Sequence, residues 1–349
     1  MENMSKILFI PGNKYTKISY LWAMSDRVWN SFLAILRAGL WERALQLPSV
    51  PDTAGWEQLL ALSREQAVMG LLLKGIAHLP AEQRPPEELQ PILRTVEEAF
   101  ARANARYARV QGELLQQLAD AGLHPVIQKG SEAAKYYANP SARQVGDIDL
   151  YLPKGEFSRA WALFPTAKMA SDGALVLTRN LVTIELHPRY FDIHRRAEKL
   201  PEPGSPCGEI LLLSAHIFKH VIGHGLGCKQ LCDMAVSLAW LEGKYDKEAL
   251  RAALQYAGLL RWHRLLCSLL VADFGLDPAC CLANFRPVDP ERLRRIVRAS
   301  GHFAYHAKTK AATAGAFLRR LPFSLSYCPR ETFATVWELA LGNLSTRGK

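Results

Sequence analysis

Two carboxylates one residue apart, Asp147 and Asp149, are the residues of this chain whose types and spacing most clearly suggest chemistry. They lie in an otherwise apolar run, residues 147–152, that is typical of a β-strand. Side chains alternate along a strand, so both carboxylates are expected on one face, opposite Ile148 and Leu150. Carboxylate oxygens are ligands that Mg²⁺ prefers, and the pair therefore predicts a divalent-metal site.

A second alternating run, residues 182–187, offers a third carboxylate. Thr183, Glu185 and His187 share one side of this predicted strand, and apolar residues occupy the other side. Glu185 could therefore join the two aspartates around a metal. His187 could orient an acceptor or support the carboxylates, although a single histidine at a strand end is more often structural.

A possible phosphate-binding turn lies upstream, where Lys129, Gly130 and Ser131 follow a predicted strand and open a predicted helix. Glycine lets the backbone approach a phosphate, and a serine at a helix start offers its hydroxyl beside free N–H groups. The same residues also fit an ordinary N-capped helix with a solvent-facing lysine. Arg143, four residues before Asp147, could bind phosphate with its planar fork or hold Asp147 in place.

The order of a glycine–serine turn, an Asp-x-Asp strand and a later acidic strand resembles the nucleotidyltransferase superfamily, with its DNA polymerase β-like palm. The closer resemblance is to an uncharacterised bacterial nucleotidyltransferase-like family and covers roughly residues 25–240. It rests on four blocks of sequence: Lys129-Gly130, Arg143 to Leu150, Glu185-Leu186-His187, and Gln230-Leu231-Cys232-Asp233. The resemblance implies an α+β fold, in which a small mixed nucleotidyltransferase sheet with helices is flanked by N-terminal and C-terminal helical regions.

The resemblance also implies a transfer reaction. A nucleoside monophosphate would pass from a nucleoside triphosphate to a hydroxyl acceptor, on a small molecule, a sugar or a protein, with release of pyrophosphate. Asp147 and Asp149 would be ligands shared by two Mg²⁺ ions, with Mn²⁺ as the alternative metal. Glu185 would be a ligand of the catalytic ion and a candidate general base toward the acceptor hydroxyl.

A downstream helix is the other part of the chain to which the resemblance gives a role. In the family this helix borders the nucleotide pocket, which makes Lys229, Gln230 and Asp233 candidate contacts to the base or the ribose. With the upstream turn and Arg143, they complete the predicted nucleotide-binding set.

Other interpretations stay open. Asp147 could cap its strand and Asp149 could pair with Arg143, in which case neither carboxylate would bind a metal. Fifteen residues separate Ser131 from Asp147, more than the usual gap in the superfamily, which leaves room for a catalytically inactive nucleotide-binding regulatory module. An RNA-directed nucleotidyltransferase is the third hypothesis, but aromatic and basic residues do not interleave in the C-terminal basic region, which contains Lys308, Lys310, Arg319 and Arg320.

The elements that must position these residues follow from hydrophobic periodicity. Ser25 is a candidate N-cap for the first helix, and Asn180 a candidate hairpin residue between strands 174–178 and 181–187. Residues 1–23 lack periodicity and suggest an upstream extension. The rest of the chain is expected to divide into an N-terminal helical region at 24–122, a nucleotidyltransferase core at 123–205 and a C-terminal helical region at 206–349.

Composition limits the partners and the compartment. A net charge of +10 and a pI near 9.3 favour anionic partners such as nucleotides, although a basic soluble surface gives the same numbers. Seven cysteines without a Cys-x-x-Cys pair predict reduced thiols in a cytoplasmic protein. No apolar run approaches the roughly 20 residues that span a bilayer.

The spacing of His216, His220 and His224 is compatible with a Zn²⁺ site on one face of a helix, but neighbouring glycines are expected to end that helix before His224.

Overall fold

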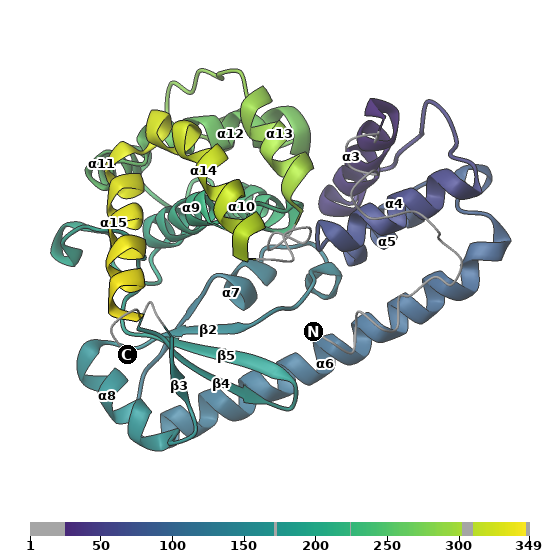
Figure 1. Ribbon diagram of the computed structural model, residues 1–349. Helices are drawn as coiled ribbons and strands as arrows, with labels where there is room; N and C mark the ends of the chain where they lie inside the picture. The colour runs from purple at the N-terminus through teal and green to yellow at the C-terminus, as the bar shows by residue number, and fades with distance from the viewer. Residues whose placement is uncertain (1–24, 171–172, 224, 302–309, 347–349) are drawn as a thin grey trace.

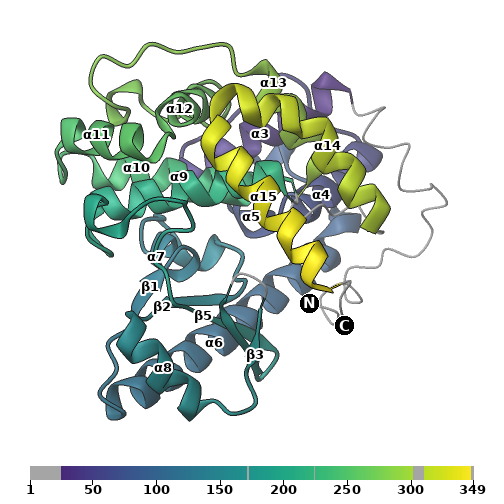
Figure 2. The same ribbon diagram turned by 60° about the vertical axis from the view of Figure 1, so that its left-hand side comes forward.

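The computed structural model describes residues 25–170, 173–223, 225–301 and 310–346 (Figures 1 and 2). This part of the chain combines many helices with one five-stranded sheet, which confirms the expected α+β class with flanking helices. Within these ranges every helix is too short or too polar to cross a lipid bilayer.

The sheet is small and mixed. Its strand order is β1-β2-β5-β4-β3, in which β2 and β5 run parallel and the other neighbours run antiparallel. Asn180 and Leu181 both have positive φ, 49° and 65°, and form a two-residue hairpin loop between β4 and β5. Asn180 was expected in this loop, whereas Leu181 was expected to begin the strand. The strands are β1 (Val126–Gln128), β2 (Ile148–Tyr151), β3 (Lys168–Met169), β4 (Leu175–Arg179) and β5 (Val182–His187).

One face of this sheet is apolar and packs on two helices, α6 (Gln90–Asp120) and α8 (Lys154–Leu163). Figure 1 shows the long α6 passing beneath the strands. Alternation along β2 and β5 turns the apolar residues toward α6, so the opposite face receives the polar side chains. The cluster includes Ile148 and Leu150 of β2, Ile184 and Leu186 of β5, and Val110, Leu114 and Leu118 of α6.

A second, larger hydrophobic cluster joins the N-terminal helices to the C-terminal helices. Ser25 caps the first of them, as expected, because its Oγ accepts a hydrogen bond from the Val28 N–H at 3.3 Å. The helices are α3 (Asp26–Trp41), α4 (Thr53–Glu65), α5 (Met69–Ala77), α9 (Pro206–Ile222), α10 (Cys228–Leu241), α11 (Lys247–Ala257), α12 (Leu260–Phe274) and α13 (Glu291–Ser300).

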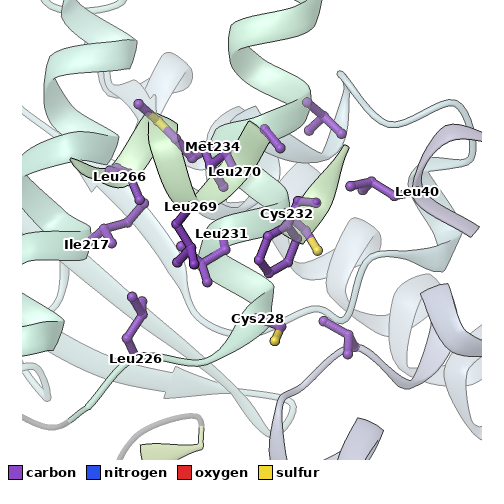
Figure 3. Packing of buried hydrophobic residues seen from close by; sticks show 14 of the residues in the cluster. Leu40, Ile217, Leu226, Cys228, Leu231, Cys232, Met234, Leu266, Leu269 and Leu270 are labelled. Carbon is purple, nitrogen blue, oxygen red and sulfur yellow. The ribbon is translucent and has the colours of Figure 1, made fainter. Parts of the chain in front are cut away.

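Helix α10 lies in the middle of this cluster. Figure 3 shows its Leu231, Cys232 and Met234 among side chains of α9 and α12, including Ile217 and Leu269. All seven cysteines are free, and all but Cys207 are buried, in agreement with the expected reduced thiols. Burial inside this apolar cluster fixes α10 in place, so residues at its N-terminal end have defined positions.

Two helices, α14 (Lys310–Tyr327) and α15 (Pro329–Thr346), complete the described C-terminal region and pack on each other. Arg320 of α14 donates hydrogen bonds to the Gly223 carbonyl oxygen at 3.4 Å and to Ser300 Oγ at 3.3 Å. Burial lowers the pKa of this arginine. Arg320 therefore stabilises contacts within the fold. Lys308, which belongs to the same basic region, lies outside the described residues.

Short elements connect these parts. A brief helix, α7 (Gly130–Ala134), follows β1 and is the helix that the Gly130-Ser131 turn was expected to open. The strand β3 was not predicted, because two exposed residues carry no alternating pattern. The remaining elements are the 3₁₀ turns η1 (Ala81–Gln83), η2 (Glu87–Leu89), η3 (Pro140–Ala142), η4 (Ala197–Lys199) and η5 (Pro278–Cys280).

Candidate active site

Two of the three predicted carboxylates lie side by side on the polar face of the sheet. Asp149 of β2 and Glu185 of β5 are direct partners in the parallel register. Their neighbours along each strand, Ile148 and Ile184, are fully buried on the other face. The Asp149 side chain is 6% exposed and that of Glu185 is 29% exposed, so both remain within reach of a group bound at the sheet.

Asp149 is surrounded by cationic and hydrogen-bonding partners. Lys129 Nζ donates to Asp149 Oδ1 at 3.0 Å, and His187 Nε2 lies 2.9 Å from the same oxygen. Burial alone would raise the pKa of the Asp149 carboxyl, but Lys129 and His187 together lower it well below its usual range. Asp149 is therefore an anion at every physiological pH.

Glu185 has the opposite electrostatic environment. Its pKa is raised, first by burial and then by the negative charges of Asp149 and Asp147. His187 Nε2 lies 3.6 Å from Glu185 Oε2 and partly offsets this repulsion. A carboxylate with a raised pKa is a better proton acceptor than an ordinary one, and this suits a general base.

Lys129 owes its position to an unusual backbone conformation. It occupies the left-handed region, with φ 49°, between the end of β1 and the start of α7. This bend turns the side chain back over the sheet toward Asp149. Burial would lower the pKa of Lys129, but Asp149, with smaller contributions from Asp147 and Glu185, raises it. The lysine is therefore a permanently charged group at the site.

Asp147 lies one residue before β2, not inside it as predicted. Its carbonyl oxygen accepts a hydrogen bond from the Tyr107 hydroxyl of α6 at 3.0 Å, so this residue leaves the strand pairing. Ser131 lies beside the same hydroxyl, and burial raises the pKa of Tyr107 to about 12. Tyr107 thus lies between the Ser131 turn and the Asp147 loop.

Among the described residues, the compact set of donor atoms that could hold a metal ion consists of Asp149, Glu185 and His187. Their ligand atoms all lie within 4.8 Å of one another. The Asp147 carboxylate is not part of this set, although it lies close enough to influence the pKa values of Lys129 and Glu185. Oxygen and imidazole donors in this number fit a divalent cation.

Arg143 and Asp233 contact each other, although 90 residues separate them. The Arg143 guanidinium forms a two-point ion pair with Asp233, Nε to Oδ1 at 2.7 Å and Nη2 to Oδ2 at 2.8 Å. The Tyr137 hydroxyl donates to Asp233 Oδ1 at 2.7 Å. Both charged side chains are about 95% buried, so the structure pairs Arg143 with Asp233, and not with Asp147 or Asp149.

The same arginine lies against the glycine of the upstream turn. A Cβ at Gly130 would lie 3.6 Å from the Asp147 carbonyl oxygen and 3.7 Å from Arg143 Nη2. Arg143 Nη1 also donates to the Gln144 carbonyl oxygen at 3.4 Å. The ion pair therefore ties α10 to both loops that carry predicted phosphate-binding and metal-binding residues.

A comparison with protein families gives a match over most of the chain. The model of an uncharacterised nucleotidyltransferase family matches residues 52–275, which include every candidate site residue. The chain belongs to this nucleotidyltransferase family. No curated protein and no solved structure shows a significant match.

Lys229 is a second lysine beside the site. It lies in the first turn of α10, and a Cβ at Gly146 would be 3.0 Å from its Nζ. Burial, followed by repulsion from Arg143, lowers the pKa of Lys229 to about 8, while Asp233 and Asp147 oppose that shift. Glycine at position 146 lets the ammonium group approach the loop that leads to Asp147.

Gln66 is a positioning residue that sequence reasoning missed. Its side-chain Oε1 accepts from the Cys228 N–H at 2.9 Å, and its backbone carbonyl accepts from the Lys229 N–H at 3.2 Å. These bonds occupy the first amides of α10 and hold its start against the α4–α5 junction. Gln230, which follows, is buried in the same helix. No motif marks Gln66, because its role depends on a contact across more than 160 residues.

The histidines of α9 form a pair rather than a complete ligand set. His216 Nε2 lies 3.0 Å from His220 Nε2, with the rings nearly perpendicular. Burial, then the neighbouring His220, lowers the pKa of His216 well below its usual value. His224 lies outside the described residues, so the structure leaves the Zn²⁺ hypothesis for the three histidines without a test.

Proposed function

We propose that this protein is a Mg²⁺-dependent nucleotidyltransferase that moves a nucleoside monophosphate from a nucleoside triphosphate to a hydroxyl-bearing acceptor. The acceptor is a small molecule, a sugar or a protein side chain. One observation carries the proposal: Asp149 and Glu185 lie in register on adjacent parallel strands, beside the partly buried ammonium of Lys129. Membership of the family supports the same class of reaction.

In the proposed reaction the acceptor oxygen attacks the α-phosphorus of the triphosphate. A new P–O bond forms, the bond from the α-phosphorus to the bridging oxygen breaks, and pyrophosphate leaves with the electron pair. Glu185 accepts the proton of the acceptor hydroxyl, and its partial exposure leaves it within reach of that group. Asp149 stays ionised throughout, because its pKa is low.

Asp147, Asp149 and Glu185 are the residues that would hold Mg²⁺. Bound there, two Mg²⁺ ions would neutralise the polyphosphate and polarise the attacking oxygen. The compact donor set around Asp149 and Glu185 supports this assignment. Asp147 is included because it lies immediately before β2, where its negative charge raises the pKa values of Lys129 and Glu185.

Two lysines are proposed to bind the triphosphate. Lys129 approaches it from the end of β1, beside Gly130 and Ser131, and Lys229 from the start of α10. Gln230 follows Lys229 and remains a candidate contact to the nucleoside. Arg143 and Asp233 are assigned a different part in nucleotide binding: their ion pair holds the two loops on which the phosphate contacts depend.

The test is release of pyrophosphate from each of the four common triphosphates with Mg²⁺ and a panel of hydroxyl acceptors. Asp149→Asn and Glu185→Gln should each abolish turnover, whereas Asp120→Asn, a surface change at the end of α6, should leave it intact. Turnover that survives in Asp149→Asn would refute the mechanism. Triphosphate binding by calorimetry without turnover on any acceptor would favour the inactive regulatory module instead.

A further inference from the structure

The candidate metal site contains a nitrogen donor. His187 is the last residue of β5. It follows Glu185 by two residues and therefore lies on the same face of the strand. Its neighbour across the strands is Tyr151, two residues after Asp149, so the imidazole stands at the carboxyl ends of both parallel strands. Its side chain is 13% exposed, which leaves little freedom for the ring to swing away.

The His187 Nε2 atom faces two carboxylates at once. It lies 2.9 Å from Asp149 Oδ1 and 3.6 Å from Glu185 Oε2. A hydrogen bond from the ring to Asp149 Oδ1 accounts for the 2.9 Å contact, but the 3.6 Å separation from Glu185 Oε2 is too long for a hydrogen bond. The hydrogen bond to Asp149 therefore accounts for only part of this convergence.

A shared cation accounts for the convergence of all three donors. Two ligand atoms bound at about 2.1 Å to one ion are about 3.0 to 3.4 Å apart in octahedral or tetrahedral geometry. The two distances from His187 Nε2, 2.9 Å and 3.6 Å, lie just outside the two ends of that interval, so a bound ion would require only small shifts of these side chains. Mg²⁺ prefers oxygen ligands, whereas transition-metal dications accept both carboxylate and imidazole.

We propose that His187 is a direct ligand, through Nε2, of a transition-metal dication such as Mn²⁺ when that ion takes the place of Mg²⁺ at this site. The proposal rests on the proposed function, since it concerns the metal site that Asp149 and Glu185 form there. It also assigns His187 a place in the site itself, beside the carboxylates, instead of a contact to the acceptor.

The direct test is pulsed electron paramagnetic resonance of Mn²⁺ bound to the full-length wild-type protein. A coordinated imidazole nitrogen gives ¹⁴N modulation of the spin echo, which carboxylate and water ligands do not give. Modulation in the wild type that disappears in His187→Gln is the expected result. Absence of modulation in the wild type, or its persistence in His187→Gln, would overturn the proposal.

Titrations with the two metals provide an independent measurement. His187→Gln should weaken Mn²⁺ binding about tenfold or more and change Mg²⁺ binding less than about twofold, because only Mn²⁺ uses the nitrogen. His124→Gln is the matched control, since that histidine also lies beside a carboxylate, that of Glu156, but is 82% exposed. Equal weakening of both metals would show that His187 only orients Asp149.

The outcomes separate this proposal from the proposed function. Loss of the ¹⁴N modulation in His187→Gln without pyrophosphate release by the wild type would support the ligand and contradict the transferase. Normal release of pyrophosphate by a wild-type protein that shows no ¹⁴N modulation would support the transferase and contradict His187 as a metal ligand. Thermal unfolding of each variant verifies that the titrations compare folded proteins.

Discussion

Asp149 contacts or pairs with three other residues of the candidate site. One of its oxygens, Oδ1, contacts both Lys129 and His187, and its strand partner is Glu185. Because its carboxylate is buried, removing the charge leaves Lys129 without its main partner as well as removing a proposed metal ligand. The residue therefore couples the proposed metal site to the position of the lysine that is proposed to bind phosphate.

Asp149→Asn is expected to lower kcat/KM for the triphosphate by about 10³-fold or more, equivalent to about 4 kcal/mol of transition-state stabilisation. The reason is that the amide cannot replace an anionic metal ligand. Steady-state pyrophosphate release measures the loss, with Asp120→Asn as the surface control. A decrease of less than about tenfold would contradict the role given to Asp149.

Lys229 should make triphosphate use depend on pH. Its pKa of about 8 lies below the ordinary value for lysine, so the charged form that attracts phosphate is lost as pH rises through about 8. The kcat/KM of the free enzyme should therefore fall above that pH. Lys229→Arg keeps its charge and should lack this alkaline decrease, and an unchanged profile in that variant would show that another group titrates.

At the scale of elements, the site depends on the contact between α10 and the two loops that flank the sheet. Alternation along β2 and β5 made the shared face of Asp149, Glu185 and His187 predictable from sequence. The partner of Arg143 was not predictable, because Asp233 lies 90 residues away and helical periodicity does not specify which loop a helix meets. The left-handed conformation of Lys129 was equally hidden, since it is a non-glycine residue in a region that glycine favours.

Breaking the buried ion pair should cost far more than breaking an exposed one. Asp233→Asn leaves the Arg143 charge buried without its anion and should destabilise the fold by about 3 to 5 kcal/mol. The matched control is Asp273→Asn, whose partner Arg294 makes a similar two-point pair but is 26% exposed, so the loss should be smaller. Urea unfolding compares the two, and equal losses would contradict the argument.

At the scale of the whole molecule, the N-terminal helices reach the site by close backbone contacts. A Cβ at Gly70 of α5 would lie 2.3 Å from the Ala142 carbonyl oxygen in η3, immediately before Arg143. Together with Gln66, this contact connects the α4–α5 junction to both α10 and the loop before β2. The family match, residues 52–275, includes this junction as well as the sheet.

Gly70→Ala should therefore disrupt the site from a distance. The added methyl group meets backbone atoms that cannot move independently, so we expect a destabilisation of about 2 kcal/mol or more and lower activity. Gly112→Ala in α6 is the control: nothing lies within 4 Å of its Cβ, and the change should stabilise the helix by about 0.5 to 1 kcal/mol. Opposite shifts in thermal unfolding temperature are expected, and shifts of the same sign would contradict this account.

The packing of α6 has a practical consequence for dissecting the protein. This helix precedes the strands in the chain, yet Val110, Leu114 and Leu118 belong to the same apolar cluster as Ile148 and Ile184. A fragment beginning at Leu123 would expose the underside of its sheet to water and should aggregate. A fragment intended to retain the strands in folded form should instead begin before Gln90, so that the helix accompanies them.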